Sequence, residues 1–102
     1  MGSGRDSGLG SGPQGESEIL AQIRSAIERA KRYPLRARAM KIQGTTHLQF
    51  LIQDDGTVQN LKILQSSGSP ILDEEAVLTI QRASPFPTYP QPLTLAIQFE
   101  LE

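Results

Sequence analysis

The chain has 102 residues, ten of them basic and eleven acidic, with a net charge of −1 and no cysteine. This length has room for one domain, and the lack of cysteine excludes disulfide bonds and thiolate metal sites. No apolar run approaches the ~20 residues of a membrane-spanning helix, and no signal peptide is visible.

The first sixteen residues are mostly glycine and serine, and their only large apolar side chains are Met1 and Leu9. Such a segment cannot bury enough apolar surface to offset the entropy that is lost on ordering. We therefore expect residues 1–16 to be a flexible leader or an expression scar, and residues 17–102 to form the folded domain.

Two helices are predicted next, separated by a proline. Apolar residues recur at helical spacing over residues 19–30, which predicts an amphipathic helix that begins after a Ser17 cap. Pro34 restricts the residue before it to extended backbone, so this helix should end by Tyr33. Pro34 is then expected to open a second, short helix that reaches Met40.

A hairpin of two strands follows. Apolar residues alternate along residues 45–53, and a returning strand is predicted over residues 58–65. Asp55-Gly56 between them is typical of a type I′ turn, in which both central residues have positive φ. We therefore expect two antiparallel strands joined by a two-residue turn.

A third helix and a last strand complete the chain. Ser69 and Pro70 are typical of a helix start, and Pro85 ends the apolar pattern that follows them. A proline-rich connector then leads into residues 93–101, where apolar and polar side chains alternate strictly. This alternation predicts a strand with one apolar face.

The order of these elements predicts how they are arranged. A helix joins the second strand to the last one, and such crossovers connect parallel strands, so the first strand should lie between them. We predict an α+β fold: a three-stranded antiparallel sheet in the order second, first, last, with helices packed on one face. The last strand then lies at an edge, although the sequence does not fix which alternate residues point outward.

No group of residues predicts catalysis, a metal or a cofactor. His47 is the only histidine, so it has no partner for a metal or acid–base site. Asp54-Asp55-Gly56 lacks the later ligands of a calcium loop, and a helix cap explains the "SSGSP" run as well as an anion site does. The PxxP motif at residues 87–90 is more simply a stiff connector. We predict that the protein is not an enzyme.

Basic residues are concentrated in one segment. Seven of the ten lie between positions 24 and 41, where Glu28 is the only acid, so this segment carries +6 (seven positive, one negative). It is either a solvated face or a surface for an acidic partner, whether protein, lipid headgroup or nucleic acid. Tyr33 is the only aromatic residue interleaved for stacking, which argues against nucleic acid.

Four motifs occur in a fixed order between Tyr33 and Leu101: "YPLRARAMKIQG", "QDDGTV", "LKILQSSGSPILDEEAVLTIQRASPFP" and "LAIQFEL". Together they resemble the C-terminal domain family of TonB. The resemblance implies a periplasmic domain that couples the proton gradient of the cytoplasmic membrane to outer-membrane transporters of iron complexes or similar nutrients. It also implies that the full-length protein is anchored in the inner membrane and meets ExbB and ExbD through a part outside this sequence.

The resemblance further implies a ligand, the TonB box, which is a short extended segment of a transporter that adds to the last strand. The implied peptide-binding residues are those of the last strand: Leu93, Thr94, Leu95, Ala96, Ile97, Gln98, Phe99 and Glu100. The implied transporter contacts surround the family's Tyr-Pro segment: Lys31, Arg32, Tyr33, Pro34 and Arg36. No metal or other cofactor is implied.

Other functions stay open at this point. A TolA-like envelope interaction domain would have a similar fold with other partners, and TonB-box peptides would separate the two. A nucleic-acid module would be retained on heparin with a steep salt dependence. The edge strand also invites a homodimer, since unpaired backbone groups attract a second copy.

Overall fold

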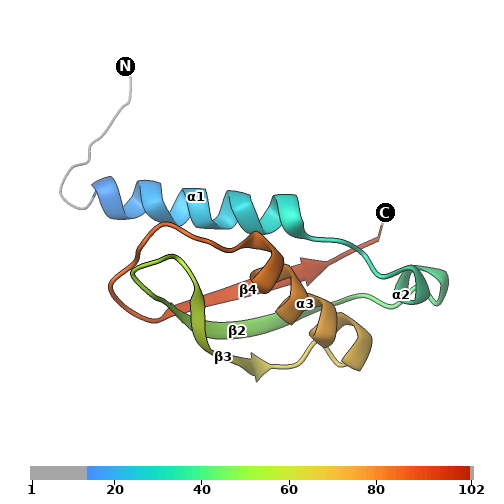
Figure 1. Cartoon of the computed structure of the whole chain (residues 1–102). Helices are drawn as coiled ribbons and strands as arrows, with labels where there is room; N and C mark the ends of the chain where they lie inside the picture. The colour runs from blue at the N-terminus through green and yellow to red at the C-terminus, as the bar shows by residue number, and fades with distance from the viewer. Residues whose placement is uncertain (1–13, 102) are drawn as a thin grey trace, which may run out of the picture.

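The computed structural model describes residues 14–101, and it contains three helices and three strands within that range (Figure 1). In chain order these are α1 (Gln14–Ala30), α2 (Leu35–Ala39), β2 (Gly44–Ile52), β3 (Val58–Gln65), α3 (Pro70–Ala83) and β4 (Leu93–Phe99).

The three strands form one sheet in the order β3-β2-β4, with both pairings antiparallel. Helix α3 crosses one face of this sheet, and α1 packs beside α3 on the same side (Figure 1). The predicted fold class and strand order are therefore confirmed. The crossover through α3 places β4 on the opposite side of β2 from β3, which leaves β4 at an edge.

The core lies between the sheet and the helices. Phe50 and Leu48 of β2 and Phe99 and Ile97 of β4 are almost completely buried, and Ile23 of α1 is fully buried with them. The other face of the sheet carries no helix in Figure 1. Its side chains are half-buried on β2 and exposed on β4.

Helix α1 differs from the prediction at its start. It begins at Gln14, so Ser17 lies inside the first turn and the predicted Ser17 cap is wrong. Acidic residues stabilise the first turn of a helix, and the sequence supplies one before Ser17, at position 16. The predicted division at 16/17 falls within this helix, and residues 1–13 lie outside the described residues.

The start of α2 and the hairpin turn also differ from the prediction. Pro34 directly precedes α2 and is not its first residue. The hairpin turn is not type I′, because Gly56 has a positive φ of 88° whereas Asp55 does not. The N–H of Gly56 instead bonds the carbonyl of Gln53, a turn of type I geometry that is closed by one left-handed glycine.

Helix α3 begins and ends as predicted, at Pro70 and Ala83. Ser69 occupies the cap position, but its side chain makes no capping hydrogen bond. Leu72, Ala76 and Ile80 form the fully buried side of the helix. This packing fixes α3 on the sheet and with it the connection to β4.

Candidate functional site

Strand β4 pairs with β2 without interruption, from Gly44 opposite Phe99 to Phe50 opposite Leu93. Its side chains alternate between buried and exposed along all seven residues. The odd-numbered residues face the core, whereas Thr94, Ala96 and Gln98 are exposed. The alternation that the sequence predicted is therefore present, and the pairing along this edge is regular.

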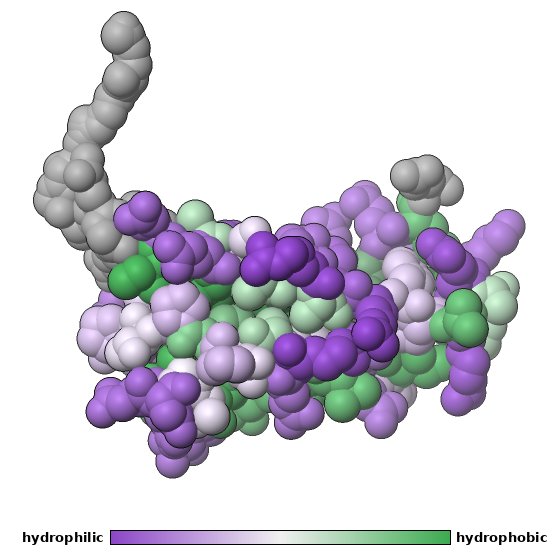
Figure 2. Space-filling model, turned by 45° about the horizontal axis from the view of Figure 1, so that its top comes forward, coloured by the Kyte–Doolittle hydropathy of each residue, from purple (hydrophilic) through white to green (hydrophobic). Residues whose placement is uncertain are grey.

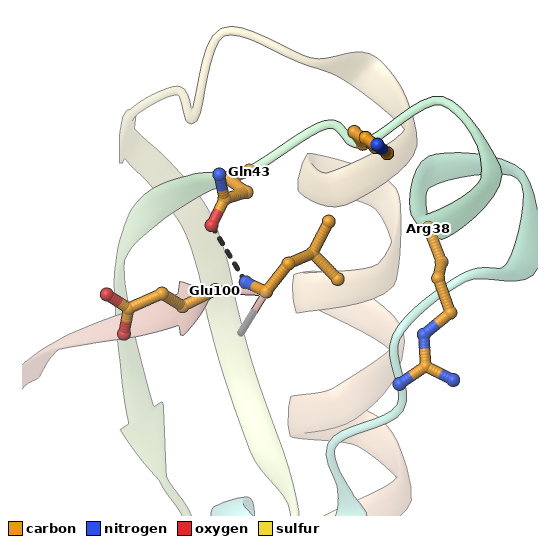
Figure 3. A pocket seen from close by; sticks show the side chains of 5 residues that line it. Arg38, Gln43 and Glu100 are labelled. Atoms are coloured by element: carbon orange, nitrogen blue, oxygen red, sulfur yellow. Dashed lines mark hydrogen bonds between the residues drawn. The ribbon is translucent and has the colours of Figure 1, made fainter.

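Two hydrogen bonds identify which backbone groups of β4 point away from the sheet. The carbonyl of Gln98 accepts a bond from the Lys31 ammonium, 2.8 Å away, so it faces outward. The N–H of Leu101 donates to Oε1 of Gln43, which precedes β2, so odd-numbered residues face β2 (Figure 3). Each residue of an antiparallel pair aims its N–H and C=O in the same direction. The outward row therefore consists of Thr94, Ala96 and Gln98.

The sheet has a second edge at β3, and this edge is irregular. Asn60 has a φ of 58°, and the register against β2 shifts between Gln49 and Leu51. A bulge of this kind bends a strand and interrupts its row of unpaired groups, which discourages another chain from pairing there. Of the two edges, β4 is the one suited to accept an extended segment.

A hollow lies beside the C-terminal half of β4, where the end of α1 approaches the edge. We call it the α1–β4 hollow; it is lined by Arg24, Glu28, Lys31, Thr45, Ala96, Gln98 and Glu100. Two basic and two acidic side chains face it, so their charges balance. Part of the basic segment found in the sequence thus lies against the predicted peptide-binding strand.

A second hollow lies at the end of β4, between the chain after β4 and the loop that follows α2. It is lined by Arg38, Lys41, Gln43, Glu100 and Leu101. In Figure 3 the side chains of Arg38 and Glu100 extend on opposite sides of the bond that joins Gln43 to Leu101. This bond continues the β2–β4 pairing past the last residue of β4.

Tyr33 has a structural role that the sequence did not predict. Its hydroxyl donates to the carbonyl of Ile42, and its ring packs edge-on against Phe99 with centroids 5.7 Å apart. It therefore joins the segment after α1 to the end of β4. Its neighbour Arg32 is exposed.

Pro34 and Arg36 face a different part of the molecule. With Leu35 they line a hollow between α2 and α3, whose other residues are Ile71, Glu74, Glu75 and Leu78. Leu35 is 79% exposed, and Figure 2 shows green surface interrupted by purple at the end of the molecule that carries α2. The five predicted transporter contacts therefore do not form one cluster, because Lys31 lies at β4 and Arg36 beside α3.

The "SSGS" run binds a carboxylate of the same chain. Asp73 of α3 accepts bonds from the N–H of Ser67 at 2.8 Å, from Thr46 at 2.9 Å and from the hydroxyl of Ser66. Burial acts to raise the pKa of Asp73, but the hydrogen bonds from Ser66, Ser67 and Thr46 together outweigh it and lower that pKa. The amide of Ser67 thus donates to this carboxylate and not to an external anion.

Two of the remaining sequence motifs, the hairpin turn and the PxxP segment, have structural explanations. Asp55 accepts hydrogen bonds from the side chain and the N–H of Thr57, which lower its pKa and order the hairpin turn. Tyr89, within the PxxP motif, is buried. His47 lies between the edge strands, opposite Ala96 and Gln65, and its Nδ1 is buried without a hydrogen-bond partner. Within residues 14–101 no three His, Cys, Asp or Glu side chains converge as a metal site would require.

Sequence reasoning missed the bond between Lys31 and Gln98. The two residues are 67 positions apart, and nothing in the local pattern distinguishes Lys31 from the six other basic residues of its segment. Only the packing of α1 beside β4 brings them together.

The described helices include none that is long and apolar enough to cross a membrane.

Comparisons with known proteins agree with this geometry. A family model described as "Gram-negative bacterial TonB protein C-terminal" matches residues 29–102. Protein TonB of Pasteurella multocida is 35% identical over 83 residues, which cover 81% of this chain and 32% of that protein. The chain spans about a third of the length of the curated relatives it matches.

Two solved structures have a similar fold. The C-terminal domain of TonB from Helicobacter pylori superimposes with a TM-score of 0.75 and 28% identity, over 93% of this chain and 98% of that one. TolAIII bound to a peptide derived from the N-terminus of TolB gives a TM-score of 0.67 over 93% of this chain and 82% of that one. At 20% identity this second likeness is one of fold alone.

Proposed function

The chain belongs to the family of C-terminal domains of Gram-negative bacterial TonB proteins, and from this we propose that it is the periplasmic, partner-binding end of an energy-coupling protein. Proteins of this family transduce energy and are not enzymes. In this proposal the full-length protein is anchored in the inner membrane, meets ExbB and ExbD there, and acts on outer-membrane transporters of iron complexes or similar nutrients.

We infer that the domain binds the TonB box of a transporter by strand addition to β4. The observation that carries this inference is the regular outward row of Thr94, Ala96 and Gln98, each of which presents one N–H and one C=O along the edge. An extended segment matches such a row because its own backbone groups have the same spacing. The bulge at Asn60 leaves β3 without a comparable row.

Strand addition also suits the transmission of force. A segment that lies along an edge resists sliding because all its ladder bonds are loaded together. Each bond contributes only about 0.5–1.5 kcal/mol net, so the equilibrium affinity is modest while the resistance to shear is large. Pulling along β4 then acts on a strand whose other side is fully paired with β2.

The likeness to TolAIII does not favour a TolA-like role over this one. It concerns the fold alone, whereas the family model matches most of the chain. A TolA-like domain would use the same edge for a segment of a different envelope protein. Binding of TonB-box peptides in preference to peptides from such proteins distinguishes the two roles.

The experiment is a titration of the domain with TonB-box peptides, with an Ala96→Pro variant as the test of the site. Proline removes one outward N–H without removing a bond to β2, and edge strands tolerate it. We expect Ala96→Pro to lose most of its peptide affinity while its melting temperature stays close to that of the wild type. Ala96→Val keeps the N–H and should bind normally. Unchanged binding by Ala96→Pro would contradict the proposal.

A further inference from the structure

One outward acceptor of β4 is already bonded in the structure of the chain alone. The ammonium of Lys31 donates to the carbonyl of Gln98 over 2.8 Å. In strand addition this carbonyl accepts a backbone N–H of the incoming segment. Lys31 and the segment therefore require the same oxygen.

The position of Lys31 is fixed by contacts on several sides. Arg82 of α3 donates two hydrogen bonds, of 3.0 and 3.1 Å, to the carbonyl of Ala30, the residue directly before Lys31. The ammonium lies 6.0 Å from the ring centroid of Phe99 and 3.4 Å from the carboxylate of Glu28. Only 26% of the Lys31 side chain is exposed. These contacts aim the ammonium at β4, which distinguishes Lys31 from a solvated surface lysine.

We propose that Lys31 is a specificity-determining residue of the β4 edge, which occupies the pairing position at Gln98 until an extended backbone displaces it. This inference rests on the proposed strand addition to β4. An incoming segment pairs with Thr94 and Ala96 without a competitor and reaches Gln98 only by exchanging its own N–H for the ammonium. Glu28, 3.4 Å from the ammonium in the free chain, is the acidic partner nearest to the displaced Lys31.

Lys31 selects a partner by the backbone that the partner presents and not by the charge of the partner's side chains. Two basic residues, Arg24 and Lys31, and two acidic ones, Glu28 and Glu100, line the α1–β4 hollow, so this hollow does not favour an acidic or a basic residue of the partner. The partner is therefore an extended segment long enough to gain a further ladder bond at Gln98. A lysine at a sheet edge also discourages pairing between two copies of the same chain, so Lys31 acts against a β4–β4 homodimer as well.

The test compares Lys31→Met with the wild type. Methionine keeps an unbranched apolar stem and removes the ammonium. In the variant without ligand, the backbone carbonyl carbon of Gln98 should shift in its ¹³C NMR signal, because it loses a charged donor. We expect TonB-box peptides to bind Lys31→Met about 3- to 10-fold more tightly, from the net value of one displaced hydrogen bond.

Two matched variants serve as controls. Lys31→Arg keeps a charged donor and should bind like the wild type. Arg29→Gln removes the charge of an exposed α1 side chain that does not line the α1–β4 hollow, and it too should leave the affinity unchanged. If Lys31→Met fails to fold, Lys31→Leu, which also lacks a donor, replaces it.

The outcomes separate this inference from the proposed function. If peptides bind the wild type but Lys31→Met binds them equally or more weakly, the specificity role of Lys31 is wrong and strand addition stands. If no variant binds peptide, strand addition is wrong, and the specificity role of Lys31 fails with it. The Lys31–Gln98 contact is tested without any peptide, by the Gln98 signal and by self-association, which Lys31→Met should increase. An unchanged Gln98 signal without increased self-association overturns it.

Discussion

Tyr33 joins two parts of the chain through contacts within the fold. Its hydroxyl bonds the carbonyl of Ile42, and its ring packs against Phe99, the last residue of β4. Tyr33 thus has a structural role within the fold, and the transporter contact that the family resemblance implies for it stays a prediction. Its effect on binding should be indirect, through the end of β4.

The first prediction concerns the Tyr33 hydroxyl. Tyr33→Phe keeps the ring packing but leaves the Ile42 carbonyl without its donor, so the free energy of unfolding should fall by about 1 kcal/mol. Urea unfolding measures this change, and the affinity for TonB-box peptides should stay the same. Reduced peptide affinity at unchanged stability would instead place Tyr33 in the interface.

Asp73 supplies stability that depends on pH. Its hydrogen bonds lower its pKa in the folded protein below the ordinary value of 3.8. A carboxyl group with a lowered folded-state pKa stabilises the fold above its unfolded pKa, and this contribution disappears as the pH falls through the folded-state pKa. The loop after β3 should therefore weaken in acid.

The second prediction follows from this linkage. Asp73→Asn should unfold at a lower urea concentration than the wild type at pH 7, and the difference should narrow steadily as the pH falls below about 4. Asp54→Asn, at an exposed position of the hairpin turn, is the matched control and should change little. A difference between Asp73→Asn and wild type that does not vary with pH would contradict this account of Asp73.

At the scale of the elements, β4 presents only alternate residues to a partner. The N–H groups of an added segment also point alternately toward β4 and away from it, so only every second one bonds to β4.

The third prediction is that methylating one backbone nitrogen of a TonB-box peptide abolishes binding at every second position and has little effect at the positions between. Calorimetry on a series of singly methylated peptides measures this pattern. Equal losses at adjacent positions would exclude strand addition.

The sequence predicted the elements well because their signals are local. Hydrophobic alternation located β4, prolines bounded α3, and the crossover rule placed β2 in the centre of the sheet. The details that it missed depend on the backbone or on distant contacts. Asp55-Gly56 is compatible with more than one turn, and the sequence did not exclude an earlier start for α1. Two features depend on register and packing between residues far apart in the chain: which alternate residues of β4 point outward, and where Lys31 lies.

At the scale of the whole molecule, the basic residues lie on more than one side. Arg24 and Lys31 border β4, Arg38 and Lys41 border its end, and Arg36 lies beside α3. A transporter that receives the segment on β4 would also meet some of these charges. Their contribution should be to the rate of association and should weaken with salt, because exposed charges are screened over about 10 Å at 0.1 M.

The fourth prediction tests whether this steering includes α2. Arg36→Glu should slow association with an intact transporter, and the effect should be largest at low ionic strength. Lys62→Glu makes the same charge change at an exposed position of β3 and should have a smaller effect. Surface plasmon resonance at two salt concentrations gives both rates. An on-rate for Arg36→Glu equal to that of the control at both concentrations would remove α2 from the interface.

The most direct test of strand addition to β4 is residue-resolved hydrogen exchange along that strand, with and without a TonB-box peptide. In the free protein the amides of Leu95 and Ile97, which face β2, should exchange slowly, and those of Thr94 and Ala96 should exchange fast. The peptide should slow Thr94 and Ala96 selectively and leave the buried side of α3 unaffected. Uniform protection of β4 in the free protein, or peptide-induced protection confined to the helices, would contradict the assignment of the β4 edge as the binding site.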